Sequence, residues 1–205
     1  PKTYLPNYRE FYELRQFTPG DAIDERNIDL LGQTDIPFGP RLLFQVEEQP
    51  LLTFFVEICE DLWTPIPPSS YAAMAGATVL INQSASPVTI GKFSYRRQLV
   101  SGQSSRCLAA YLYSEAGFGE STTDLAWDGQ GMICENGTLL EETQRYTYSS
   151  QLISAEVDLD RLVQDRTRQN SFGQAAARYR QALAEFRTVS FSVDLPTTGK
   201  LLLQR

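Results

Sequence analysis

Short apolar runs in the first half of the chain are separated by a helix-like segment. The runs LLTFFVEIC (51–59) and ATVLINQSAS (77–86) are rich in Val, Ile, Leu and Phe and are bounded by Pro, Gly and Ser. Such runs are typical of buried strands. Between them, PPSSYAAMAGA (67–77) starts with Pro and Ser and has Gly near its end, as helices often do. The pattern predicts a β-α-β unit.

The alternation continues toward the C-terminus. Residues 93–110 predict a long helix, which leads into a strand over 111–117. In 129–143, two apolar runs are joined at Asn136 and Gly137, the preferred pair for a two-residue type I′ hairpin turn. These elements extend the predicted α/β fold.

Three further segments complete the predicted elements. Residues 8–17 predict a short helix or turn that ends at the TPGD turn (18–21), and 151–166 predict a strand followed by a helix. An amphipathic helix is expected over 173–186, with one apolar side made by Ala176, Tyr179, Leu183 and Phe186. Without internal repeats, 205 residues predict a single domain, 1–205.

Composition narrows the class of protein. The apolar fraction of 42% with 11% aromatics argues against disorder, and no apolar run approaches the roughly 18 residues of a membrane span. With 18 basic and 25 acidic residues, the net charge of −7 argues against nucleic acid as a partner. We expect a protein without membrane association whose partner is a small molecule or another protein.

The cysteines exclude a zinc site and suggest a compartment. Cys59, Cys107 and Cys134 are widely spaced, and the chain has no histidine to complete a zinc set. We therefore expect no metal site, a reducing, cytoplasmic location, and structural roles for Cys107 and Cys134. The chain starts with PKTYLP, without an initiator Met or the apolar core of a signal peptide, which indicates a fragment.

Cys59 stands in an unusual stretch, VEICEDLW (56–63). A cysteine at the end of an apolar strand is most often a small buried hydrophobe. Here Glu57, Glu60 and Asp61 crowd the strand end, and their negative charge would raise the pKa of the thiol. A nucleophile at a strand-to-helix elbow is an alternative. Without histidine, its activation would require a carboxylate base and a lysine.

Five stretches closely resemble the glutaminase domain of glutamine-dependent NAD synthetases, a branch of the nitrilase (carbon–nitrogen hydrolase) superfamily. They are EICEDLW, PPSSYAAMAGATVLINQSASP, YRRQLV, SSRCLAAYLYSEAGFGESTTDLAWDG and ENG. The resemblance covers nearly the whole chain. It implies a four-layer α-β-β-α sandwich and a Glu–Lys–Cys catalytic triad in place of Cys–His.

The resemblance assigns roles position by position. The nucleophile falls on Cys59 and the catalytic lysine on Lys2, and the oxyanion would be held by the Lys2 ammonium and the backbone N–H of Glu60. A second, structural glutamate falls on Glu13, with Glu10 as the alternative. Glu60 would also accept a hydrogen bond from the substrate's α-ammonium. The residues expected to line the glutamine pocket are Tyr8, Glu60, Trp63, Ser86 and Lys92.

In this family the general base precedes the lysine, so the resemblance implies an incomplete glutaminase domain whose N-terminal part is missing. The C-terminal synthetase domain, which uses ATP and Mg²⁺, is expected to be absent too, because no Ser-Gly-Gly-x-Asp-Ser loop occurs. The implied activity is glutamine hydrolysis that supplies ammonia for NAD synthesis from nicotinic acid adenine dinucleotide, in a homo-oligomer. The alternatives are a free-standing amidase for another amide and a catalytically inactive fragment.

Overall fold

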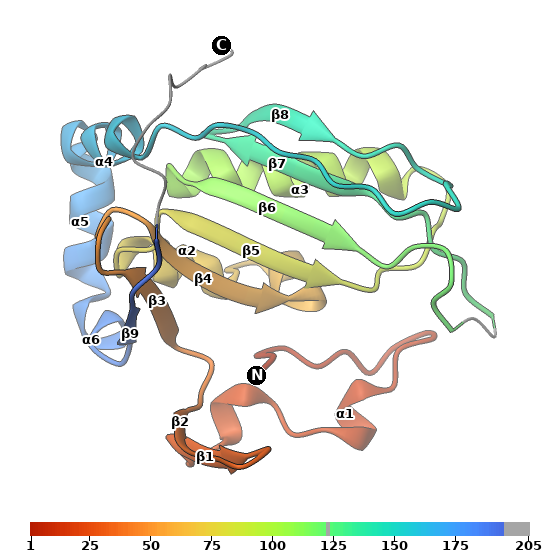
Figure 1. Cartoon of the computed structure of the whole chain (residues 1–205), viewed down its shortest axis with the longest axis horizontal. Helices are drawn as coiled ribbons and strands as arrows, with labels where there is room; N and C mark the ends of the chain where they lie inside the picture. Colours follow the sequence, from red (N-terminus) through yellow and green to blue (C-terminus); the bar gives the residue numbers. More distant parts are fainter. Residues whose placement is uncertain (122–123, 195–205) are drawn as a thin grey trace.

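The computed structural model describes residues 1–121 and 124–194. A seven-stranded mixed sheet forms its centre, and a two-stranded hairpin lies outside that sheet (Figure 1). The strands of the large sheet are, in order across it, β8 (Thr138–Glu142), β7 (Gly131–Glu135), β6 (Ala110–Glu115), β5 (Val79–Ser84), β4 (Thr53–Ile58), β3 (Leu42–Val46) and β9 (Arg187–Phe191). The hairpin consists of β1 (Asn27–Leu30) and β2 (Gln33–Pro37).

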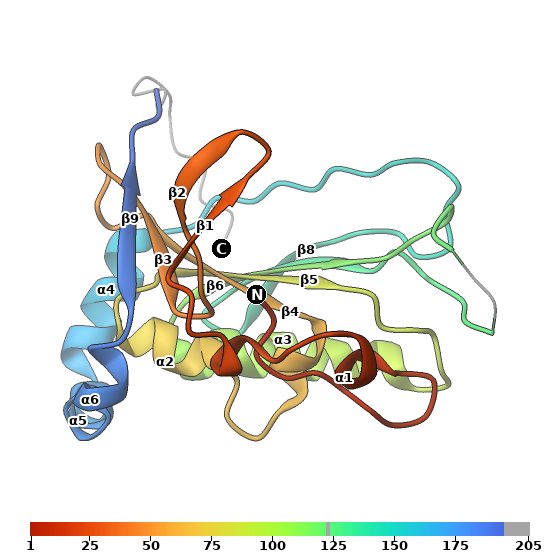
Figure 2. The same ribbon diagram turned by 90° about the horizontal axis from the view of Figure 1, so that it is seen from below.

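Helices cover one face of the large sheet. Figure 2 shows α2 and α3 beneath that face, and α4, α5 and α6 beside the end formed by β3 and β9. The helices are α1 (Glu13–Gln16), α2 (Pro68–Met74), α3 (Lys92–Cys107), α4 (Leu159–Arg168), α5 (Asn170–Arg178) and α6 (Arg180–Leu183), with 3-10 turns η1 (Gly20–Ala22) and η2 (Cys59–Trp63).

The predicted β-α-β unit is confirmed by β4, α2 and β5. The strands β4 and β5 are parallel, and α3 then returns the chain to β6, which is parallel to β5. The core lies between these strands and their helices, where Phe55, Leu80 and Tyr111 of adjacent strands are almost fully buried together with Ala72 of α2 and Val100 of α3. Burial on this face explains why the strands read as apolar runs.

The predicted hairpin turn is also confirmed. Asn136 and Gly137 join the antiparallel strands β7 and β8 with φ values of 45° and 86°, both positive as a type I′ turn requires. A Cβ on Gly137 would lie 2.9 Å from the side chain of Ser105, so the close approach of α3 also demands glycine at this position.

Two predicted elements differ from the structure. Residues 151–157 form no strand, and Leu152 is 96% exposed, because no neighbouring strand pairs with this segment. The helix predicted over 173–186 is interrupted at Tyr179, whose backbone leaves the helical region and separates α5 from α6. Over 8–17, the single turn α1 agrees with the predicted short helix or turn.

The face of the large sheet opposite α2 and α3 is apolar. Register aligns Val56, Ile81, Leu112 and Ile133 in one row across four strands, and Val56 is 39% exposed. Apolar sheet faces of this kind are usually buried against a second sheet about 10 Å away. The described residues thus provide one helix layer and one sheet of the predicted four-layer sandwich.

Candidate active site

Cys59 forms a strained elbow directly after β4. It is the first residue of η2, is 8% exposed, and has φ of 47°, a left-handed conformation that non-glycine residues rarely adopt. The side chain of Asn82 in the adjacent strand holds this turn: its oxygen accepts the Cys59 N–H at 3.2 Å and its nitrogen donates to the Cys59 carbonyl at 3.4 Å. The buried amide therefore fixes the direction of the sulfur-bearing residue.

Asp61 ties the N-terminal segment to the same elbow. Its carboxylate accepts the backbone N–H groups of Thr3 at 3.1 Å, Tyr4 at 2.8 Å and Ile58 at 3.0 Å. Asp61, which lies two residues after Cys59, thus joins the start of the chain to the end of β4. Lys2 is brought to the Cys59 region by this contact.

Lys2 is fixed by two further contacts. Its ammonium lies 2.5 Å from Glu13, and its side chain is only 9% exposed. Its carbonyl accepts the Gly20 N–H at 2.8 Å, and a Cβ on Gly20 would lie 2.9 Å from that oxygen. Glu10, the alternative to Glu13, lines the pocket described next instead of binding Lys2. The geometry therefore favours Glu13 as the partner of the lysine.

A pocket of about 430 Å³ opens over Cys59. The predicted nucleophile and the predicted substrate-binding residues come from four separate parts of the chain and line this one cavity. They are Tyr8, Cys59, Glu60, Trp63, Ser86 and Lys92. Lys2 and Glu13 are not among the lining residues and form their ion pair beside the elbow.

The pocket presents both signs of charge. The Tyr8 hydroxyl donates to the two Glu60 carboxylate oxygens at 2.8 and 2.9 Å, and burial together with this bond raises the pKa of Tyr8 to about 12. Lys92 lies 5.3 Å from the centre of the Trp63 ring, and burial followed by the charge of Arg96 lowers the pKa of Lys92. An acidic and a basic group in one cavity suit a zwitterionic ligand.

Burial keeps the Cys59 thiol protonated. It raises the pKa of the thiol, while the nearby charge of Lys2 acts in the opposite direction and that of Glu115 adds to the increase. Because the thiolate is the reactive form, Cys59 would need a base to remove its proton in order to act as a nucleophile.

The three acids around Cys59 do not form one cluster, contrary to the sequence-based expectation. Glu57 points into the core, where it accepts the Ser69 N–H at 2.9 Å and the hydroxyl of Tyr111, and burial raises its pKa to about 7. Asp61 is occupied by backbone N–H groups, and Glu60 alone lines the pocket.

Sequence reasoning missed several polar groups beneath the site. Asn82 carried a signal, since it is a polar residue in the middle of an apolar run. Arg96, in the YRRQLV stretch, is 1% exposed and binds Asp128 through two nitrogens at 2.9 and 3.2 Å, and its charge lies 3.7 Å from Glu115. The partners of Arg96 are 19 and 32 residues away, so no local pattern identifies them.

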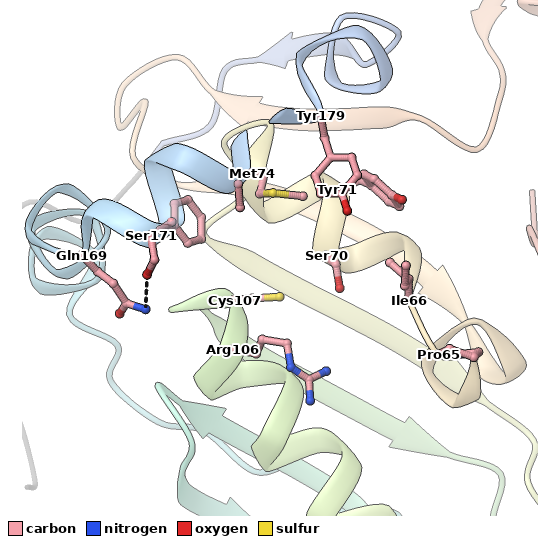
Figure 3. A pocket seen from close by; sticks show the side chains of 12 residues that line it. Pro65, Ile66, Ser70, Tyr71, Met74, Arg106, Cys107, Gln169, Ser171 and Tyr179 are labelled. Carbon is pink, nitrogen blue, oxygen red and sulfur yellow. Dashed lines mark hydrogen bonds between the residues drawn. The ribbon is translucent and has the colours of Figure 1, made fainter. Parts of the chain in front are cut away.

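A second pocket of about 410 Å³ lies between α2, the end of α3 and α5, and contains Cys107 (Figure 3). Burial raises the pKa of this thiol to about 12. Tyr71, Met74 and Phe172 give the cavity a largely apolar wall, and no lysine is found among the described residues that line it. The charges of Arg166 and Arg106 lower the pKa of Cys107, but burial and the charge of Glu57 act more strongly in the opposite direction.

The described residues contain neither a metal-binding cluster nor a membrane-spanning helix. Within residues 1–121 and 124–194, no group of three or more Cys, Asp or Glu side chains is arranged to hold a metal ion. In the same part of the chain, no helix is both long enough and apolar enough to cross a membrane.

A comparison with curated proteins decides the family. The glutamine-dependent NAD(+) synthetase of Mycobacterium tuberculosis is 50% identical over 205 residues, which is all of this chain and 30% of that protein. The chain belongs to the glutamine-dependent NAD(+) synthetase family. It spans about 30% of the length of this relative. No protein-family model matches the chain.

Solved structures agree with membership of the NAD(+) synthetase family. The glutamine-dependent NAD(+) synthetase of Cytophaga hutchinsonii superposes with a TM-score of 0.58 and 30% identity over 70% of this chain and 22% of that one. A carbon-nitrogen hydrolase from Helicobacter pylori superposes with a TM-score of 0.62 over 91% of this chain and 61% of that one, at 17% identity. The latter likeness shows a shared carbon–nitrogen hydrolase fold.

Proposed function

We propose that this chain is part of a glutaminase domain, which hydrolyses the side-chain amide of glutamine and supplies ammonia for NAD synthesis from nicotinic acid adenine dinucleotide. One observation carries the proposal. The nucleophile and the five residues expected to bind glutamine line a single pocket, although they come from distant parts of the sequence. The similarity to glutamine-dependent NAD(+) synthetases supports glutamine as the substrate of that pocket.

The charges of the pocket match the two ends of an amino acid. Glu60, oriented by the Tyr8 hydroxyl, is placed to accept hydrogen bonds from the α-ammonium of glutamine. Lys92, held against Trp63, offers a cation to its α-carboxylate. These contacts direct the side-chain amide toward Cys59, which lies in the same cavity.

In the proposed reaction, the Cys59 sulfur attacks the amide carbon while a base takes the thiol proton. The resulting oxyanion is stabilised by the Lys2 ammonium and the backbone N–H of Glu60. The C–N bond breaks, the base returns its proton to the departing nitrogen, and ammonia leaves behind a thioester. Water then hydrolyses the thioester, which releases glutamate and restores the thiol.

The remaining parts of the activity are assigned to the rest of the full-length protein. A glutamate that precedes Lys2 would be the general base, and the layer that carries it would cover the apolar row of Val56, Ile81 and Leu112. A synthetase domain would use the ammonia together with ATP and Mg²⁺, and the protein would form a homo-oligomer. None of these roles requires a cofactor or metal in the Cys59 pocket.

The test is labelling of the full-length protein with a glutamine-derived diazoketone, followed by digestion and mass spectrometry. We expect one adduct on Cys59 that excess glutamine suppresses, with Cys107 and Cys134 as internal controls in the same sample. Labelling of the other cysteines, or labelling that glutamine does not suppress, would contradict the proposal. Equal turnover of acetamide and glutamine would favour a general amidase, and an unlabelled, inactive protein would favour an association module.

A further inference from the structure

Polar side chains lie side by side beneath Cys59, at the carboxyl ends of three parallel strands. The β4–β5 register pairs Ile58 with Gln83, so Cys59 falls beside Ser84, and the β5–β6 register pairs Ser84 with Glu115. In sheets of this kind, ligands bind at the carboxyl ends of the strands. The row Cys59, Ser84 and Glu115 therefore lies at the end of the sheet where the site is, and Cys59 is the member of the row that lines the pocket.

Glu115 is a buried acid with several partners. Its side chain has no exposed surface, and its carboxylate accepts the Tyr113 hydroxyl and the backbone N–H of Ser86, each at 2.5 Å. A guanidinium nitrogen of Arg96 lies 3.7 Å from the same carboxylate. Glu115 thus joins β6 to Ser86, which lines the pocket.

Ser84 lies between this acid and the nucleophile. Its hydroxyl oxygen is buried and has no hydrogen-bond partner among the residues that the structure describes. Burial raises the pKa values of Cys59 and Tyr113, and the nearby Ser84 hydroxyl acts in the opposite direction on both. A buried hydroxyl without a hydrogen-bond partner destabilises the folded protein, so its presence between two titratable groups requires an explanation.

We propose that Ser84, Tyr113 and Glu115 are positioning residues that form a chain of hydroxyl groups from the Cys59 sulfur to a buried carboxylate. A small shift of the Ser84 hydroxyl would close the chain, so that the S–H donates to Ser84, Ser84 to Tyr113, and Tyr113, as in the structure, to Glu115. When the thiol loses its proton, the Ser84 hydroxyl rotates and donates to the thiolate. Ser84 stabilises the reactive sulfur in this way, whereas the charge of Glu115 opposes ionisation. The kinetic consequence of the chain rests on the proposed glutaminase function.

Other charged groups face both ends of this chain. Those that face Cys59 are Lys2, Tyr8, Glu60, Lys92 and Glu115. Those that face Glu115 are Lys92, Arg96, Tyr113 and Asp128. Lys2 and Glu115 act on the sulfur in opposite directions, so removal of either charge should move its ionisation in a known direction.

The experiment measures how fast iodoacetamide alkylates Cys59 in the full-length protein between pH 6 and 10, with each site quantified by peptide mass spectrometry. Ser84→Ala removes the donor to the thiolate, so we expect the alkylation profile to move to higher pH. Glu115→Gln removes the negative charge, so the profile should move to lower pH. A shift of one pH unit changes the rate on the low-pH side about tenfold.

Matched controls and a rescue separate this role from a structural one. Ser114→Ala and Glu141→Gln replace exposed residues of the same sheet and should leave the profile unchanged. Glu115→Asp keeps the charge and should return the profile toward that of the unmodified protein. Labelling of buried Cys107 or Cys134 would reveal a variant that has lost its fold.

The two variants must move the profile in opposite directions. Shifts in the same direction, or a Ser84→Ala profile that matches the Ser114→Ala control, would overturn the inference. If Glu115→Gln fails to fold, Ser84→Ala and Glu115→Asp decide alone. Because alkylation does not use glutamine, opposite shifts in a protein that releases no ammonia would refute the proposed function and leave this inference standing. Ammonia release with unchanged profiles would refute the inference alone.

Discussion

Two pockets of this protein are nearly equal in volume, and each contains a buried cysteine. Cys59, in a cavity of about 430 Å³, has a left-handed backbone and charged neighbours from the N-terminal segment, η2 and the start of α3. Cys107, in a cavity of about 410 Å³, is the last residue of the regular helix α3 and faces mostly apolar side chains. Neither the cavity volume nor the sulfur distinguishes the two.

Electrostatics separates the two cysteines. Burial raises the pKa of both thiols. For Cys107 the next contribution, the charge of Glu57, raises the pKa further, and the charges of Arg166 and Arg106 oppose it. For Cys59 the next contributions, the Ser84 hydroxyl and the charge of Lys2, both lower the pKa, and the charge of Glu115 opposes them. The strongest neighbours of Cys59 thus favour the reactive thiolate, and the strongest neighbour of Cys107 disfavours it. The comparison teaches that the neighbours of a cysteine decide its chemistry.

The most direct way to break this comparison is to remove each sulfur in turn. We expect Cys59→Ala in the full-length protein to lower glutamine-dependent ammonia release on the order of 10⁴-fold or more, since the nucleophile is lost. Cys107→Ala should leave the rate per folded molecule within about twofold and cost about 1–2 kcal/mol of stability through a small cavity. Appreciable ammonia release by Cys59→Ala would show that the sulfur is not the nucleophile.

The lysine that lowers the pKa of Cys59 is the next target. Lys2→Met should lower kcat by about 10²–10³-fold, the usual loss when an oxyanion donor is removed. It should also slow the alkylation of Cys59, because the thiolate loses a nearby positive charge. Arg15→Met, at an exposed position of α1, is the control. A higher KM with unchanged kcat would instead assign Lys2 to substrate binding alone.

Arg166 supports the side of the molecule that contains Cys107. Its guanidinium, buried against Phe172, donates to four backbone carbonyls at the C-terminal ends of α2 and α3, among them that of Cys107 at 3.1 Å. We expect Arg166→Met to lower the free energy of unfolding by about 3 kcal/mol, because these carbonyls lose a charged donor. Exposed Arg168→Met should cost less than about 0.5 kcal/mol in the same urea titration.

Glutaminase activity per folded molecule should survive Arg166→Met. The carbonyls that Arg166 binds lie in the last turns of α2 and α3 or shortly after them, whereas the Cys59 pocket includes Lys92 at the start of α3. A loss of activity larger than the loss of folded protein would show that the two regions are coupled.

Glu57 lies between the two regions, and its effect is confined to a dependence on pH. Its folded pKa of about 7 exceeds the usual value of 4.5, so the folded protein holds a proton that the unfolded chain releases between these values. Stability from this group therefore falls as pH rises from about 4.5 to 7 and is constant above. The total change is about 3 kcal/mol.

Urea titrations at several pH values test this sign. In Glu57→Gln the contribution disappears, so the difference in unfolding free energy between the unmodified protein and the variant should change over this pH range. Glu141→Gln, at an exposed position, should follow the unmodified protein at every pH. A pH dependence that is the same in the unmodified protein and in Glu57→Gln would exclude the raised pKa.

Local signals explain which elements could be predicted from the sequence. The apolar runs of β4 and β5, the Pro–Ser start of α2 and the Asn136–Gly137 turn all depend on neighbours within a few residues. Pairing over long distances leaves no such signal. The strand β9 was not predicted because its partner β3 lies about 140 residues earlier in the chain. The strand expected within 151–157 did not form, since nothing pairs with it.

The residues of the candidate site also fall into those that the sequence predicted and those that it did not. The family resemblance predicted residues that line one pocket, Cys59, Tyr8 and Trp63 among them. It did not identify Asn82 or Glu115, whose roles follow from the register that places them beside the elbow. A side chain that contacts a residue of a neighbouring strand can be identified only when the register of the strands is known. The stretch 119–129 includes residues 122 and 123, outside the described structure, and no role is assigned to it.

The carboxylate of Asp61 connects two parts of the site. One side chain accepts N–H groups from the segment that carries Lys2 and from the strand end that carries Cys59. One side chain therefore holds both segments, and its loss would disturb the position of Lys2 and that of Cys59 together. Over evolutionary time, substitutions at Asp61 should be tolerated less often than its place outside the pocket lining would suggest.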